Sequence, residues 1–218
     1  MDNFADDPLV QAITAYVQSY MQNYDASHDW SHIERVLGLA RYIYSKSENQ
    51  AELNLRVIHL AALLHDVGDK KYLPPNTTST TQIASLLTAH GAPPALAQRV
   101  QTICLGVSYS SEAADPARVA ALVAAHPELA VVQDADRLDA LGAIGLGRMF
   151  TFGGAKTGRP MDESMEHVDD KLLRLGGMAK TAVGRELARE RSERLEVFKG
   201  WWAEERGFAG WEGAKVPT

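Results

Sequence analysis

The sequence predicts an all-α protein that folds as a single domain. Apolar residues recur at three- and four-residue steps through most of the 218 residues, which is the spacing of one helix face. No stretch of six or more residues alternates convincingly as a strand would, and neither a repeat nor a linker divides the chain. With 45% apolar residues, the chain can bury the core of one medium-sized domain. We place this domain at residues 1–206, followed by a short polar tail at 207–218.

Two capping patterns predict the first two helices. The first helix begins at Asp7-Pro8, where a capping residue precedes proline at the first helical position. Its apolar stripe continues to Tyr24. The second helix is expected to begin at Ser31, which forms with Glu34 the S-x-x-E pattern of a capping box.

Later helices follow from the same periodicity. The third covers about residues 51–66, and the Pro- and Thr-rich stretch 70–81 after it is expected to be a loop. A glycine-rich loop is expected at 152–160. The remaining helices are predicted at about 80–90, 94–107, 116–126, 130–149, 165–175 and 180–206.

Composition narrows the class of protein. The net charge is −6 and no Lys/Arg cluster is long enough to follow a phosphate backbone, which argues against a nucleic acid polymer as partner. The acidic N-terminal stretch does not resemble a signal peptide, and no apolar run approaches the ~20 residues that span a bilayer. The one cysteine, Cys104, is expected to be a small buried hydrophobe. We therefore expect a soluble, cytoplasmic protein without a membrane partner.

Three of the predicted helices place ionisable side chains on apolar faces. His32 shares a face with Val36, His65 and Asp66 end the third helix, and Asp136 shares a face with apolar residues and Asp139. Each such group buried alone would need its own hydrogen-bond partners, whereas convergence on one divalent cation removes that need.

Two imidazoles and two carboxylates form a mixed nitrogen and oxygen ligand set. This set suits Mn²⁺, Fe²⁺, Mg²⁺, Ni²⁺ or Zn²⁺. Four protein ligands leave two positions of a six-coordinate ion open for water and a substrate oxygen, as in a catalytic site. A single inward histidine is more often a core residue, so the hypothesis depends on the order of all four residues along the chain.

That order, with the motifs HDWSHIERV, LLHDVGD, QDADRLDALGAIGLGR and EHVDDKLLRL, resembles the HD-domain superfamily of metal-dependent phosphohydrolases. The motifs look like those of its small single-domain branch and cover about residues 25–200. The resemblance implies an HD-type helical bundle with one divalent ion, Mn²⁺ first, held by His32, His65, Asp66 and Asp136. Asp136 is preferred to Asp134 because the family ligand lies in an Ala-Asp pair before a basic or small residue, and helix geometry agrees.

The resemblance also implies an activity. Some members of this branch are similar to nucleoside triphosphate pyrophosphohydrolases, so we expect hydrolysis of a small nucleotide in which metal-activated water attacks phosphorus. A 5′-nucleotidase or cyclic phosphodiesterase on the same site is the alternative, as is a non-catalytic HD domain that binds a nucleotide. A second metal, or an oxygenase with two irons, would need more ligands than His90 and His126, which we assign to helix ends.

Further residues are expected to act on the substrate. Asp66 is counted as both ligand and catalytic group, Asp69 is a candidate to orient or deprotonate the water, and Lys70 to neutralise phosphate charge. An exposed ion pair with Lys70 or Lys71 suits Asp69 equally well.

Three more side chains are candidates for substrate contact, namely His28, Arg148 and Lys171, although each would also serve as a solvated surface charge. Arg137 is expected to hold carboxylates beside the metal. GGAKTG at 153–158 does not match the P-loop pattern, which leaves a lid or a surface loop. The sequence leaves the oligomeric state open.

Overall fold

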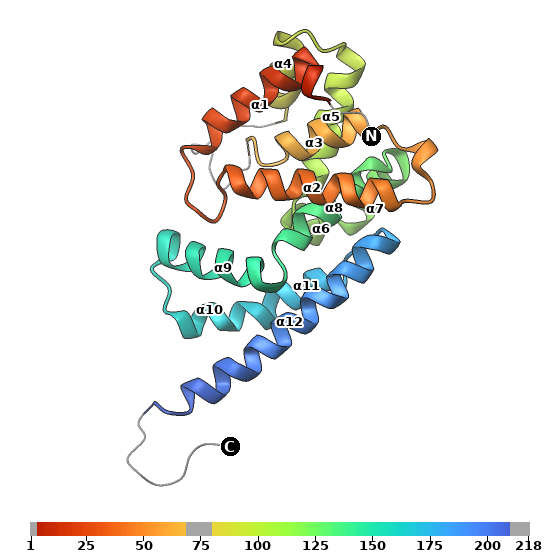
Figure 1. Ribbon diagram of the computed structural model, residues 1–218. Helices are drawn as coiled ribbons and strands as arrows, with labels where there is room; N and C mark the ends of the chain where they lie inside the picture. Colours follow the sequence, from red (N-terminus) through yellow and green to blue (C-terminus); the bar gives the residue numbers. More distant parts are fainter. Residues whose placement is uncertain (1–3, 69–79, 210–218) are drawn as a thin grey trace.

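The computed structural model describes residues 4–68 and 80–209, and these residues form helices and connecting turns without a strand (Figure 1). The α-helices are α1 (Pro8–Met21), α2 (Trp30–Lys46), α3 (Leu55–Leu64), α4 (Gln82–Ala89), α5 (Pro94–Val107), α6 (Tyr109–Ala114), α7 (Pro116–Ala125), α8 (Glu128–Asp139), α9 (Gly142–Phe152), α10 (Met161–His167), α11 (Leu173–Gly176) and α12 (Ala182–Arg206). The all-α prediction is confirmed. None of the helices described is both long and apolar enough to span a bilayer.

The core lies where α2, α3, α5 and α8 pack against one another. Their inward side chains, such as Ile33, Ile58, Ile103 and Leu138, are almost completely buried. Helices α9, α10, α11 and α12 form a second group, which contacts the first mainly through α8 (Figure 1). Helix α8 therefore borders both groups, and it carries Asp136.

Several predicted elements begin where their sequence signals place them. The Asp7 carboxylate accepts hydrogen bonds from the backbone N–H groups of Leu9 (3.0 Å) and Val10 (3.4 Å), so the predicted cap of α1 is confirmed. The helix ends at Met21 and its stripe does not continue to Tyr24. Helix α5 has the predicted bounds.

The predicted cap of α2 is wrong. Asp29 Oδ1 accepts from the backbone N–H of His32 at 3.2 Å, and the helix begins at Trp30 rather than at Ser31. A carboxylate complements the positive end of the helix dipole better than a hydroxyl, and Asp29 lies two residues upstream of Ser31. His32 consequently lies within the first turn of α2.

The third predicted helix is also shorter than expected. A 3₁₀ turn covers Gln50–Glu52, and α3 begins only at Leu55, where the Asn54 side chain caps Val57 N at 3.1 Å. His65 and Asp66 lie in the turn that follows Leu64. Most of the expected loop at 70–81 lies outside the described residues.

The helix predicted at 130–149 is two helices. Helix α8 ends at Asp139, and α9 begins at Gly142, whose φ of 68° lies in the left-handed region that favours glycine. The break reverses the chain direction enough for Arg148 on α9 to contact Asp139 on α8. The periodicity missed this break because the apolar positions of α8 continue into the apolar, glycine-rich sequence of α9 without a proline or a cluster of turn residues between them.

Two further expectations need correction. The loop expected at 152–160 is partly helical, because a π-helical turn, Gly153–Thr157, continues α9 until Gly158 at φ 58°. The helix expected at 165–175 begins earlier, at Met161, and contains a second π-helical turn, Val168–Leu172, which carries Lys171. Helix α6 was not predicted, since its six residues are too short for a periodic signal.

Candidate metal centre

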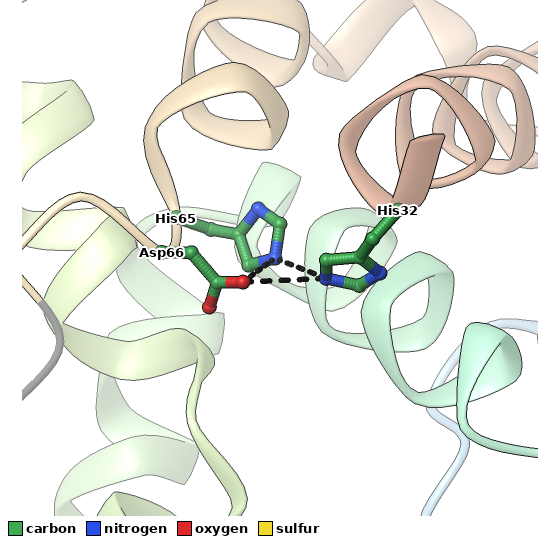
Figure 2. Close-up of side chains that lie close together, drawn as sticks. All are labelled: His32, His65 and Asp66. Carbon is green, nitrogen blue, oxygen red and sulfur yellow. Dashed lines mark hydrogen bonds and ion pairs between the residues drawn. The ribbon is translucent and has the colours of Figure 1, made fainter. Parts of the chain in front are cut away.

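Four side chains from three parts of the fold converge at the inner end of α3. We call His32, His65, Asp66 and Asp136 the four-residue cluster. His32 Nε2 lies 3.2 Å from His65 Nε2, 3.3 Å from Asp66 Oδ2 and 3.6 Å from Asp136 Oδ1. Figure 2 shows three of these side chains, His32, His65 and Asp66, pointing toward one another. The structure therefore brings together the four residues that the sequence proposed as ligands.

The remaining distances complete the cluster. His65 Nε2 lies 3.6 Å from Asp66 Oδ2 and 3.7 Å from Asp136 Oδ1. One ligand atom from each of His32, His65 and Asp66 fits within a separation of 4.8 Å, a spacing that could hold a metal ion. The two imidazoles are buried, while 26% of the Asp136 side chain is exposed. Asp136 is thus the member of the cluster closest to solvent.

In both imidazoles, the hydrogen bond made by Nδ1 determines whether Nε2, the nitrogen that faces the cluster, carries a proton. His32 Nδ1 donates to Asp139 Oδ2 at 2.8 Å, and His65 Nδ1 donates to the carbonyl oxygen of Ala62 at 2.8 Å. A neutral imidazole that donates through Nδ1 carries a lone pair on Nε2. In the neutral form of both rings, the two Nε2 atoms therefore present lone pairs to the centre of the cluster.

The carboxylates add further lone pairs at the same place. Asp66 Oδ2 is buried and accepts no hydrogen bond from the part of the chain that the structure describes. A buried acceptor without a donor is unfavourable, and this one lies beside the two Nε2 atoms, which face each other at 3.2 Å. A divalent cation would satisfy all four atoms, so the donor set and its geometry fit a metal ion.

The charges of the cluster also favour a cation. Burial acts to lower the pKa of His65, but the carboxylates of Asp66 and Asp136 outweigh it and raise this pKa to about 9. Burial acts to raise the pKa of Asp136, and the nearby imidazoles of His65 and His32 reverse this and lower it. The two carboxylates therefore attract positive charge strongly, whether it arrives as a proton or as a metal ion.

Asp139 is a functional candidate to which the sequence gave no role. Its Oδ1 accepts from Arg35 Nε at 2.7 Å, and its Oδ2 accepts from Arg35 Nη2 at 3.0 Å and Arg148 Nη1 at 3.1 Å, in addition to His32. Burial acts to raise the pKa of Asp139, but hydrogen bonds from His32 and Arg35 lower it to about 2. Its position one turn after Asp136, on the same helix face, was the available signal.

Asp134 points away from the cluster. Its carboxylate accepts from Lys180 N (2.9 Å), Thr181 N (2.7 Å) and Thr181 Oγ1 (2.8 Å). It thereby anchors the segment that leads into α12. Arg137, expected to hold carboxylates near the metal, instead donates to Glu112 Oε2 at 2.6 Å.

A cleft of about 160 Å³ adjoins the cluster, and the three predicted substrate-contact residues line it together with His65, Asp66 and Asp136. Arg148 also supports the protein itself, because its Nε donates to Ser27 O at 2.7 Å and its Nη1 to Asp139. His28 Nδ1 lies 2.7 Å from Ser27 Oγ, and Lys171 Nζ lies 5.6 Å from the centre of the Tyr109 ring. Asp69 and Lys70 lie outside the described residues.

Comparisons with known proteins agree with this geometry. An HD domain profile matches residues 29–141, a span that contains the four-residue cluster and Asp139. The Bacillus subtilis (strain 168) protein YpgQ is 37% identical over an alignment of 194 residues, which covers 86% of this chain and 89% of YpgQ. The crystal structure of B. subtilis YpgQ in complex with ADP matches with a TM-score of 0.71 at 35% identity, covering 90% of this chain and 94% of that chain. An HD-superfamily hydrolase from Bacillus thuringiensis matches with a TM-score of 0.65 at 29% identity, covering 90% and 95% of the two chains.

Proposed function

The chain belongs to the HD domain family, and from that premise we propose that it is a metal-dependent phosphohydrolase acting on a small nucleotide. The observation that carries the proposal is the convergence of the two Nε2 lone pairs with two carboxylates. His32, His65, Asp66 and Asp136 would hold one divalent ion, for which we favour Mn²⁺ over Mg²⁺, Fe²⁺, Ni²⁺ and Zn²⁺. Such an ion, when bound, lowers the pKa of water and withdraws charge from a phosphoryl oxygen.

The protein's own residues would position the reactants. Asp139, held by Arg35 and Arg148, fixes the ring of His32 so that its Nε2 faces the cluster. Asp136, the exposed carboxylate of the cluster, and Asp66 border the cleft in which the phosphate would lie. A water molecule at this border would lie beside two carboxylates able to accept its proton.

Basic side chains would neutralise the phosphates. Lys171, Arg148 and His28 line the cleft beside the cluster and are the proposed phosphate contacts. Phosphoryl transfer depends mainly on positioning and on charge neutralisation, which such a lining provides. Lys70 and Asp69 keep their proposed roles in phosphate binding and in orienting water.

Two findings support a nucleotide as the substrate class. The YpgQ crystal structure contains ADP, and that protein is 37% identical to this chain over 194 aligned residues. We propose that a nucleoside triphosphate is cleaved to a monophosphate and pyrophosphate. Release of orthophosphate from a monophosphate would favour the 5′-nucleotidase alternative instead.

The test is a product assay. Mn²⁺-loaded protein is incubated with a panel of ribo- and deoxyribonucleoside mono-, di- and triphosphates and cyclic nucleotides, and pyrophosphate and orthophosphate are measured separately. We expect pyrophosphate from triphosphates, and a loss of at least about 1,000-fold in kcat/KM in the His65→Ala variant, because one ligand is removed. Turnover no higher than that of His65→Ala across the panel, with several metals, would refute hydrolysis.

A further inference from the structure

The cleft beside the cluster is small for a whole nucleotide. Its volume of about 160 Å³ is below the range of roughly 300–1,000 Å³ that is usual for pockets that enclose small-molecule ligands. Its lining combines the basic residues Arg137, Arg148 and Lys171 with Asp66 and Asp136, whose charge a bound divalent ion would offset. A space of this size and charge suits phosphate groups, so the nucleoside needs another place.

A larger cavity of about 460 Å³ adjoins the cleft. The two share His65, Ser108 and Ser110 as lining residues, so they meet at one imidazole of the cluster and at the start of α6. We call this space the α5–α6 cavity. Its volume lies within the usual range for a bound small molecule.

The linings of the two spaces differ in charge. In the described part of the chain, the α5–α6 cavity has one basic and one acidic lining residue, Arg118 and Asp115, whose charges offset each other. The rest of its lining is apolar, hydroxyl or amide in character, including Val67, Ile83, Gln101, Cys104, Leu105, Ser111 and Ala114. Apart from His65, which it shares with the cleft, this mixed lining carries little net charge and suits a sugar and a base better than a phosphate.

Gln101 contributes a polar group of fixed orientation to the lining of the α5–α6 cavity. Its Oε1 accepts from the backbone N–H groups of Ile83 (2.9 Å) and Ala84 (3.1 Å), so the orientation of its amide is set. Its Nε2 is buried and has no hydrogen-bond partner within residues 4–68 and 80–209. An acceptor atom of a ligand that reached this wall would remove the unfavourable free energy of an unpaired donor.

We propose that the nucleoside half of the substrate occupies the α5–α6 cavity, while its phosphates lie in the basic cleft beside the four-residue cluster. The inference rests on the proposed function, because it assumes a nucleotide ligand. It assigns substrate recognition to α5 and α6, and phosphate binding to α8, α9 and the π-helical turn that carries Lys171.

The proposal can be tested with two neighbouring alanines on α6. Ala114 is exposed and lines the α5–α6 cavity, whereas Ala113 is equally exposed and lines neither space. Ala114→Trp would fill the cavity from its solvent side without disturbing the core, and Ala113→Trp is the matched control. Calorimetry on the full-length, Mn²⁺-loaded protein measures the binding of ADP and of pyrophosphate, which lacks the nucleoside.

We expect Ala114→Trp to weaken ADP binding by at least about tenfold, a change of about 1.4 kcal/mol, and to leave pyrophosphate binding within about twofold of the control. Lys171→Ala should weaken both ligands. Equal ADP affinity in the two tryptophan variants, or an equal loss for ADP and pyrophosphate, would overturn the inference.

These binding results are separable from those of the product assay. ADP binding that responds to Ala114→Trp in a protein without turnover would support the inference and refute the hydrolase. Turnover in a protein whose ADP affinity is unchanged by Ala114→Trp would support the hydrolase and refute the inference. A wild-type protein that binds no ADP would overturn the inference as well.

Discussion

Asp134 and Asp136 lie two residues apart on α8 and meet opposite kinds of neighbour. Asp134 is completely buried and is surrounded by donors, two backbone N–H groups and one hydroxyl. Asp136 is partly exposed and faces the Nε2 atoms of His32 and His65 at 3.6 and 3.7 Å, which exceeds a hydrogen-bond length. A carboxylate with all its donors present is a structural anchor, whereas one that faces other lone pairs indicates a place for a cation.

The same contrast separates Glu112 from Asp66. Glu112 accepts from Gln133, Arg137 and Lys180, and so ties α6 to α8 and to the segment before α12. Asp66 Oδ2 accepts no hydrogen bond from any of the residues described. Glu112 thus ties helices together through its donors, whereas the unpaired Asp66 Oδ2 faces the imidazoles of the cluster.

Replacing Asp134 should reduce the stability of the fold without affecting metal binding. Asp134→Ala leaves Lys180 N and Thr181 N without their acceptor, and we expect a loss of about 3 kcal/mol in unfolding free energy, measured by urea denaturation. Mn²⁺ affinity of the folded protein should stay within about twofold of wild type. Asp134→Asn, which keeps an acceptor oxygen, should lose about 1 kcal/mol. An unchanged urea midpoint in Asp134→Ala would show that Asp134 is not an anchor.

Asp139 combines features of the structural and the metal-binding carboxylates. It accepts hydrogen bonds from Arg35, Arg148 and His32, and through His32 it orients a proposed metal ligand. Asp139→Asn weakens the hydrogen bond that sets the orientation of His32, and we expect Mn²⁺ affinity to fall by about 10- to 100-fold. The measurement is a calorimetric titration with Mn²⁺ at neutral pH. Arg189→Gln, which removes an exposed helical ion pair, serves as the control and should leave this affinity unchanged. A wild-type affinity in Asp139→Asn would exclude the supporting role.

His59 shows a third outcome for a buried ionisable group, which is to remain neutral. Burial lowers the pKa of His59 to about 4, and the charge of Arg41 adds to the effect. The unfolded chain, with a pKa near 6.5, binds more protons between these values, so this contribution to stability is complete above about pH 6.5 and falls as the pH drops toward 4.

We therefore expect the unfolding free energy to decrease by about 1–2 kcal/mol between pH 7 and pH 5. Urea denaturation at each pH measures the change. His59→Leu cannot take up the proton and should show a correspondingly smaller decrease over this range. An equal slope in the variant would assign the pH dependence to other groups.

Local signals predicted much of the fold, and tertiary contacts decided the rest. Asp7-Pro8 and Asp115-Pro116 each mark the start of a helix, because the cap and the proline act within a few residues. The break between α8 and α9 depends on Gly142 at a positive φ, packed against Arg191. The pattern of apolar residues within one segment cannot predict this contact, because Arg191 lies about 50 residues further along the chain.

The candidate site was more predictable at its centre than around it. The sequence proposed His32, His65, Asp66 and Asp136, and the structure brings their side chains together. It gave Asp139 no role, because that role depends on Arg35 and Arg148, which lie on other helices. The packing of the bundle sets these contacts, since Arg35 lies 104 positions before Asp139 and Arg148 reaches it from the next helix.

The most direct test compares the two aspartates of α8 by calorimetric titration of metal-free protein with Mn²⁺. Wild type and Asp134→Asn should each bind one ion per chain with the same affinity, while Asp136→Asn should bind at least about 100-fold more weakly. Circular dichroism would establish that all three proteins are folded. Wild-type Mn²⁺ affinity in Asp136→Asn, or no saturable binding by the wild-type protein, would contradict the assignment of the four-residue cluster as a metal centre.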